Sequence, residues 1–237
     1  PPKRFGAGLF PPRVHPPCMT FSVCTRVPSA EHDAGDGPAF AVAVATDAPA
    51  VGALCPYVSH EGVVATQSFV NVRLGRRGID LLPDLAVDDA LPGLLEQGDH
   101  RELRQLHGVD GRGNEFAFTG EDCDEWCGHE VRDGITAAGN MLATGDTLPA
   151  VVDAVEAADG RIGERLLDGL DAGVEAGGDK RGHSSAAILV KAPRTTAFHD
   201  LRVDEHEDPV AELRRVYEAA VDASDGFSES SKERIFD

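Results

Sequence analysis

The sequence predicts a protein of the α+β class. Runs rich in Val, Thr and Ala come first, helical segments follow, and strands and a helix return near the end. This order favours sheets covered by helices rather than alternating strand and helix units. A length of 237 residues is enough for one domain with a full core.

The N-terminal half contains most of the predicted strands. Apolar or β-branched runs predict strands at 20–27, 40–46, 51–58 and 62–68, and the Gly35 to Gly37 segment predicts a turn between the first two. Leu and Ala at helical spacing then predict helices at 78–82 and 87–96. Two more strands, 104–109 and 115–119, flank the turn sequence at 110–114.

The C-terminal half is predicted to be mainly helical. After a loop that contains Trp126, we expect a short strand at 135–138 and helices at 148–158 and 162–176. Strands at 185–191 and 197–203 follow, and a helix at 209–223 begins next to Asp208.

The composition changes at both ends of the chain. Residues 1–18 contain six prolines and three cations but no acid, in a chain that is otherwise strongly acidic. We therefore expect a leader outside the fold, a single domain at 19–223 and a mobile polar tail at 224–237. The natural start of the protein is expected at Met19.

The charge balance limits the possible partners. The chain carries 41 acids and 22 bases, a net charge of −19, and only four of its cations are lysines. Binding to nucleic acid requires basic patches, so nucleic acid is not expected as a partner. An acidic, lysine-poor surface is typical of a cytoplasmic protein adapted to molar salt.

The cysteines and the apolar runs exclude two further classes. Five cysteines without a regular spacing do not predict a disulfide framework. No apolar run reaches the roughly 18 residues that a membrane-spanning helix requires, and no membrane partner is expected.

A glycine-bracketed charged run precedes the predicted strand at 185–191. Gly177, Gly178 and Gly182 surround Asp179, Lys180 and Arg181. Glycines permit positive φ and a close approach of backbone N–H groups to a bound group, so this loop is a candidate seat for an anion or a carboxylate. A tight loop whose Lys and Arg form salt bridges is the alternative.

Several short motifs in order resemble one known family. They are Met19-Thr20-Phe21-Ser22, Ala50-Val51-Gly52-Ala53, Val64-Ala65-Thr66-Gln67-Ser68 with Asn71, Phe118-Thr119-Gly120-Glu121 with Trp126, Gly128 and His129, Gly139-Asn140-Met141-Leu142, the glycine-rich loop, and Asp200-Leu201-Arg202-Val203-Asp204 with Asp208-Pro209. Over roughly residues 19–220 the chain is similar to the family called "domain of unknown function 1028", of the N-terminal nucleophile (Ntn) hydrolase-like group. The resemblance implies a four-layer αββα sandwich, a possible amide hydrolase and a homo-oligomer.

In an Ntn mechanism one residue supplies both the nucleophile and the base. The resemblance points to Thr20, whose hydroxyl would attack while its own α-amine takes the proton. An α-amine has an ordinary pKa of about 7.7–8.0, so part of it is neutral near pH 7. The mechanism requires removal of residues 1–19. Otherwise Thr20 is an ordinary strand residue.

Other candidate site residues have roles around Thr20. Asn140 is a candidate donor to the oxyanion, or alternatively a turn or capping residue. Lys180 is expected to lower the pKa of the α-amine or to neutralise developing charge, Asp179 to orient Lys180, and Arg181 to bind a substrate carboxylate. Gln67, Ser68 and Asn71 are candidate ligand contacts at the point where a strand passes into a loop, with ordinary loop hydrogen bonding as the alternative, and Ser185 is a further candidate substrate contact.

Two other chemistries receive less support. Cys123, Cys127 and His129 could contribute zinc ligands, but no second cysteine pair is present, and no metal or other cofactor is predicted. His60 and His107 have no partners at a spacing that indicates a Ser-His-Asp triad. The predicted function is hydrolysis of a small amide-containing substrate. The alternative is a non-catalytic ligand-binding or self-assembling protein with the same fold.

Overall fold

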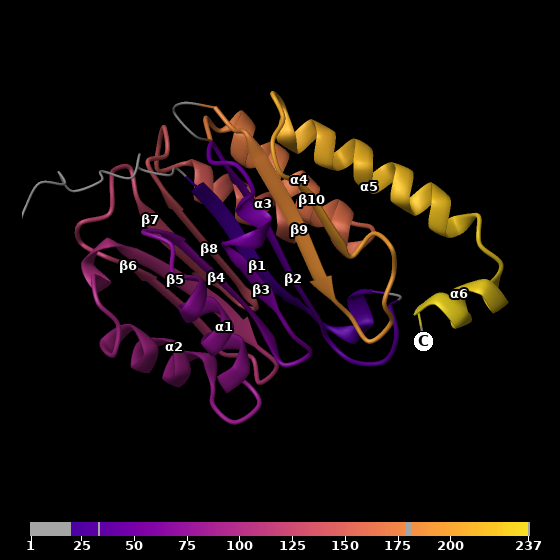
Figure 1. Cartoon of the computed structure of the whole chain (residues 1–237), viewed down its shortest axis with the longest axis horizontal. Coiled ribbons are helices and arrows are strands. Elements are labelled where there is room, and N and C mark those ends of the chain that lie inside the picture. Colours follow the sequence, from indigo (N-terminus) through magenta and orange to yellow (C-terminus); the bar gives the residue numbers. More distant parts are fainter. Residues whose placement is uncertain (1–19, 33, 179–181, 237) are drawn as a thin grey trace, which may run out of the picture.

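The computed structural model describes residues 20–32, 34–178 and 182–236, and in these ranges the chain is a mixed α+β protein with two antiparallel sheets and six α-helices. The sheets pack face to face, and Figure 1 shows α1 (Val72–Leu81) and α2 (Val87–Glu96) on the outer side of one sheet and α4 (Ile162–Glu175) and α5 (Pro209–Asp225) on the outer side of the other. Asp33, Asp179, Lys180 and Arg181, the expected leader and Met19 lie outside the described residues.

Sheet A has six strands in the order β10-β9-β2-β1-β8-β7. Its members are β1 (Thr20–Val27), β2 (Ala39–Thr46), β7 (Gly128–Arg132), β8 (Ile135–Asn140), β9 (Ser185–Lys191) and β10 (Asp200–Val203). Sheet B has the order β3-β4-β5-β6, formed by β3 (Pro56–Val58), β4 (Gly62–Ser68), β5 (Arg104–Asp110) and β6 (Glu115–Thr119).

Strand alternation gives each sheet two different faces. In β2, Ala39, Ala41, Ala43 and Ala45 face one way, into a cluster with helices α3 (Thr147–Ala157), α4 (Ile162–Glu175) and α5 (Pro209–Asp225). Phe40, Val42 and Val44 face the other way and meet Val63, Ala65 and Val109 of sheet B. Successive side chains of a strand point to opposite faces, so this single strand contributes to two interior layers.

Helices α1 (Val72–Leu81) and α2 (Val87–Glu96) cover the outer face of sheet B (Figure 1). Leu74, Leu91 and Leu95 pack there against Val64 and Leu106. Among the described residues, no helix is both long and apolar enough to cross a membrane.

Most predicted elements are confirmed, and the differences have local causes. The predicted strand at 51–58 is wrong over its first part, because Val51–Ala53 forms a 3-10 turn after Ala50, whose φ is 60°. The helix predicted at 78–82 is the end of α1, which begins ten residues before Leu82, after the capping side chain of Asn71. The predicted strand at 197–203 begins only at Asp200.

Two elements are absent from the sequence prediction. Strand β7 is short and polar. It has no apolar run that would predict a strand, and it forms by pairing with β8. Residues 224–236, where a polar tail is expected, contain the last residues of α5 and the helix α6 (Glu229–Phe236). None of the residues of α6 is buried, so the helix has no buried apolar face that its sequence could have indicated.

Candidate functional site

One end of sheet A gathers candidate residues from four strands. Thr20 lies opposite Asn140 on one side and opposite Thr46 on the other, and Thr46 lies opposite Ser185. The four residues therefore form one row across the sheet. Side chains in such a row lie on the same face, and here that face is directed toward sheet B.

Thr20 is the first residue of β1 and is almost fully buried, with 4% of its surface exposed. Its Oγ1 lies 3.0 Å from Oγ1 of Thr46. From the opposite sheet, Gln67 donates a long hydrogen bond of 3.5 Å from Nε2 to the carbonyl oxygen of Thr20. The structure thus brings together three residues from distant segments, Thr20, Gln67 and Asn140.

Ser185 and Asn71 have local structural contacts. The hydroxyl of Ser185 donates to the carbonyl oxygen of Ala48 at 2.5 Å and accepts from the backbone N–H of Val51 at 3.1 Å. Asn71 caps α1 by accepting the backbone N–H of Arg73 at 3.0 Å. Ser185 therefore holds the loop after β2, and Asn71 stands outside the Thr20 cluster, at a cavity of about 230 Å³ near Arg77 and Arg104.

The glycine-rich loop has the backbone that its glycines predict. Gly177, Gly178 and Gly182 take φ values of 107°, 40° and 101°. The carbonyl oxygen of Gly178 also accepts the backbone N–H of Ala143, three residues after Asn140, at 3.0 Å. Asp179, Lys180 and Arg181 lie outside the described residues, but the residues flanking them reach the same end of sheet A as Thr20.

A network of buried amides joins the two sheets next to Thr20. Gln105 of β5 accepts at Oε1 from Nδ2 of Asn140 at 2.9 Å and from Nε2 of Gln67 at 3.0 Å. All three side chains are buried. Buried amides of this kind are costly unless they are paired, and here each is hydrogen-bonded.

The network continues to a buried histidine. Ser22 donates to Oε1 of Gln67 at 2.5 Å, and its Oγ lies 2.8 Å from Nε2 of His107. Nδ1 of His107 lies 2.9 Å from Oγ1 of Thr136. Burial lowers the pKa of His107 to about 3, with His129 adding to the effect, so the imidazole is neutral at pH 7.

The hydrogen-bond partners of Ser22 argue against His107 as its activating base. Ser22 has a single hydroxyl hydrogen, which it donates to the amide oxygen of Gln67. His107 must then donate from Nε2 to Ser22 and accept at Nδ1 from Thr136. The orientation is therefore opposite to the one that a Ser-His pair needs for nucleophilic attack.

Sequence reasoning missed Ser22, Gln105, His107 and Thr136. Each alternates with an apolar residue of its strand, and their common feature is that all four face the space between the sheets. The detectable signal was a set of polar residues at alternate positions of several predicted strands. Without the strand order, this signal did not indicate a single cluster.

Backbone strain marks the rim of the cluster. Ser68 follows Gln67 with φ 65°, and Met141 follows Asn140 with φ 55°. Left-handed φ is uncommon for residues other than glycine and carries a cost, so surrounding structure must hold both turns. Hydrogen bonds from Met141 N to Asp124 O and from Val70 N to Ser68 O provide part of that support.

The three candidate zinc ligands do not converge. Sγ of Cys123 contacts the carbonyl oxygen of Arg104, Sγ of Cys127 contacts that of Cys123, and Nδ1 of His129 lies 3.0 Å from Oγ1 of Thr119. Burial raises the pKa of both thiols, which disfavours the thiolate that a metal requires. Within the described ranges, no group of three or more His, Cys, Asp or Glu residues could hold a metal ion.

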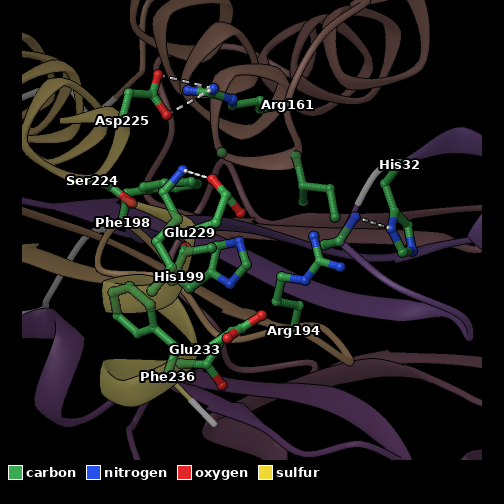
Figure 2. Close-up of a pocket in the computed structure, with 16 residues that line it drawn as sticks. His32, Arg161, Arg194, Phe198, His199, Ser224, Asp225, Glu229, Glu233 and Phe236 are labelled. Atoms are coloured by element: carbon green, nitrogen blue, oxygen red, sulfur yellow. Dashed lines mark hydrogen bonds and ion pairs between the residues drawn. The ribbon is translucent and has the colours of Figure 1, made fainter. Parts of the chain in front are cut away.

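A larger cavity lies at the opposite end of sheet A. It has a volume of about 500 Å³ and is lined by residues that follow β1 and β9, together with the ends of α5 and α6. Figure 2 shows Arg194, His199 and Glu233 around it and the ion pair between Arg161 and Asp225 at its rim. In the described part of the chain, neither this cavity nor the smaller one is lined by Thr20.

Comparisons with known proteins relate this chain to one protein family and to one solved structure. A family model described as "Family of unknown function (DUF1028)" matches residues 20–213. A crystal structure of a DUF1028 protein from Silicibacter pomeroyi is similar to this chain, with a TM-score of 0.76 and 32% sequence identity over 86% of each chain. No curated protein matches the sequence.

Proposed function

We propose a function for this chain, which belongs to the DUF1028 family of unknown function, from the residues gathered at Thr20. The chain acts as an Ntn-type hydrolase of a small amide-containing substrate, with Thr20 as nucleophile once the residues before it are removed. The observation that carries the proposal is the row in which Thr20 lies between Asn140 and Thr46, with Gln67 contacting its carbonyl oxygen from the other sheet.

The packing of the layers supports a four-layer αββα sandwich of the Ntn type. Helices α1 and α2 cover sheet B, the two sheets face each other, and α3, α4 and α5 cover sheet A. In such a sandwich, the proposed nucleophile at the start of β1 lies between the sheets, at an edge that loops can approach.

The proposed reaction is an acyl transfer in two steps. The Thr20 hydroxyl oxygen attacks the substrate carbonyl carbon, and the hydroxyl proton moves to the α-amine of the same residue. Nδ2 of Asn140 donates to the oxyanion, and the proton then passes to the departing amine as the C–N bond breaks. Water attacks the resulting ester while the α-amine accepts a proton from it, and that proton returns to Oγ1 of Thr20 as the ester C–O bond breaks and the acid is released.

The charged loop completes the proposal. Lys180 lowers the pKa of the α-amine, Asp179 orients Lys180, and Arg181 binds a substrate carboxylate. The support is positional, because Gly178 and Ala143 join this loop to the segment after Asn140.

The proposal is tested with a preparation that begins at Thr20 and a β-lactone probe, whose ring opens when a hydroxyl attacks it. We expect an ester on Thr20, seen by mass spectrometry of the N-terminal peptide. Thr20→Ala should slow labelling by more than about 1,000-fold, because it removes the nucleophile. One glycine added before Thr20 should be nearly as damaging, because it converts the amine to an amide. Thr195→Ala, an exposed threonine far from the row, is the matched control.

One observation favours the second candidate, a non-catalytic ligand-binding or self-assembling protein. The Thr20 hydroxyl is already hydrogen-bonded to Thr46, and the side chain is almost fully buried. If Thr20→Ala and the glycine extension are labelled at the wild-type rate, the Ntn mechanism is wrong and this candidate replaces it.

We also propose a salt-adapted, cytoplasmic homo-oligomer. The net charge of −19 supports the salt adaptation, because it causes self-repulsion that molar salt screens, whereas the oligomer rests on the family resemblance. Transfer from molar to millimolar KCl should lower the melting temperature or dissociate the oligomer, as followed by calorimetry and sedimentation. An unchanged melting temperature and mass across that range would contradict the salt adaptation.

A further inference from the structure

Gln105 is a completely buried residue that crosses from sheet B to sheet A. Its Nε2 donates to the carbonyl oxygens of Gly139 at 2.6 Å and Gly128 at 3.0 Å, and lies 3.1 Å from Oγ1 of Thr119. Backbone carbonyls only accept hydrogen bonds, so they determine which end of the Gln105 carboxamide is the nitrogen.

The fixed orientation of Gln105 determines the orientation of its neighbours. Its Oε1 faces Nδ2 of Asn140 at 2.9 Å and Nε2 of Gln67 at 3.0 Å. If the Asn140 carboxamide rotated by half a turn, two amide oxygens would face each other in a buried site. The low dielectric of the interior makes that arrangement expensive.

We infer that Gln105 is a positioning residue of the proposed site, one that holds the Asn140 carboxamide with its nitrogen beside Thr20 and one N–H left for the oxyanion. This inference rests on the proposed function. Gln105 itself does not touch the substrate. Its effect comes from holding a donor in place before the reaction begins, which is where electrostatic catalysis gains most.

The same residue links the nucleophile to this donor. Gln67 shares Oε1 of Gln105 with Asn140 and also reaches the carbonyl oxygen of Thr20 through its Nε2. One carboxamide therefore connects the two residues that the mechanism requires to be aligned. Only Gln or a protonated Glu at position 105 offers both a donor and an acceptor at the right distance from the backbone.

The first test uses Gln105→Leu and the β-lactone probe on the preparation that begins at Thr20. Because Asn140 loses its acceptor, we expect the maximal labelling rate to fall by on the order of 100-fold, with little change in the probe concentration that gives half the maximal rate. Thr66→Val is the matched control, since it alters a buried threonine of sheet B whose side chain points away from the cluster and whose Oγ1 has no hydrogen-bond partner among the described residues. It should label at nearly the wild-type rate.

The second test uses Gln105→Glu, which keeps the shape. A protonated Glu can donate to the Gly139 carbonyl oxygen and accept from Asn140, whereas an ionised one faces two carbonyl oxygens. Burial and those oxygens raise the pKa of such a carboxyl group. We expect the labelling rate relative to wild type to be nearly normal at pH 6 and to fall at least tenfold at pH 8.

The outcomes separate the two proposals. If Thr20→Ala is labelled like wild type, the proposed function fails and the role of Gln105 fails with it. If Thr20→Ala is inert but Gln105→Leu is no slower than Thr66→Val, the function stands and the positioning role is overturned. If Gln105→Leu does not fold, Gln105→Glu decides, and an equal relative rate at pH 6 and pH 8 overturns the inference.

Discussion

The two faces of strand β1 enter interior layers of different chemistry. Phe21 and Val23 lie in an apolar cluster with residues of α3 and α4. On the opposite face, Ser22 joins a hydrogen-bonded layer that contains His107 and two glutamines. Hydrophobic burial alone would fill both layers with apolar side chains.

The difference between these two layers assigns different roles to the two faces of β1: the apolar face contributes to stability, and the polar face contributes to the proposed site. The helix-covered layer tolerates any arrangement that fills its volume, whereas the intersheet layer requires each donor to meet an acceptor. A polar network that is fully paired has one favourable arrangement, and this property suits a site that must hold Asn140 and Thr20 in register. The apolar part of the intersheet layer, around Phe40 and Val42, lies farther from Thr20 along β2.

The largest expected effect concerns the response of the two layers to pH. His107 has a pKa of about 3 in the folded protein and an ordinary value near 6.5 when unfolded. Between these values the unfolded chain binds the extra proton, so stability falls as the pH falls from 6.5 toward 3. The slope approaches about 1.4 kcal/mol per pH unit, which gives about 2 kcal/mol between pH 7 and pH 5.

His107→Gln should therefore lose less stability than wild type on acidification. Urea unfolding of both proteins at pH 7 and pH 5 measures the difference, and His183, whose pKa burial also lowers, is present in both. Identical losses of stability would show that His107 is not the buried neutral imidazole on which the contrast between the layers depends.

The sequence was sufficient for most of the fold because local signals determine it. Strands β1, β4, β6 and β9 and helix α2 have the predicted bounds, since each combines residues of suitable propensity with Gly, Pro or Asp at its ends. Strand β7 has no apolar run, and its existence depends on pairing with β8. Helix α1 depends on a cap at Asn71 that the sequence analysis interpreted as a ligand contact.

The candidate site was only partly predictable for a different reason. The resemblance selected Thr20, Asn140 and Gln67, which the structure places together. Gln105 and His107 could not be assigned to the site from the sequence. They meet Asn140 and Thr136 only because the two sheets pack against each other, and these pairs lie 35 and 29 residues apart in the chain. Sequence spacing indicates which face of a strand a residue occupies, but the partner on the facing sheet depends on strand order.

The smallest expected effect compares two buried threonines with identical chemistry. Thr136 lies in the intersheet layer and its hydroxyl meets His107, whereas Thr66 points toward the α1 and α2 side, where its buried Oγ1 has no hydrogen-bond partner among the described residues. Thr136→Val should lower the free energy of unfolding by about 1–2 kcal/mol, because Nδ1 of His107 is left without a donor. Thr66→Val should raise it by up to about 1 kcal/mol, because it replaces an unpaired buried hydroxyl with a methyl group of similar size. Both values come from urea unfolding at pH 7. If the two substitutions change stability in the same direction, pairing of polar groups is not what distinguishes the intersheet layer from the layer beneath the helices.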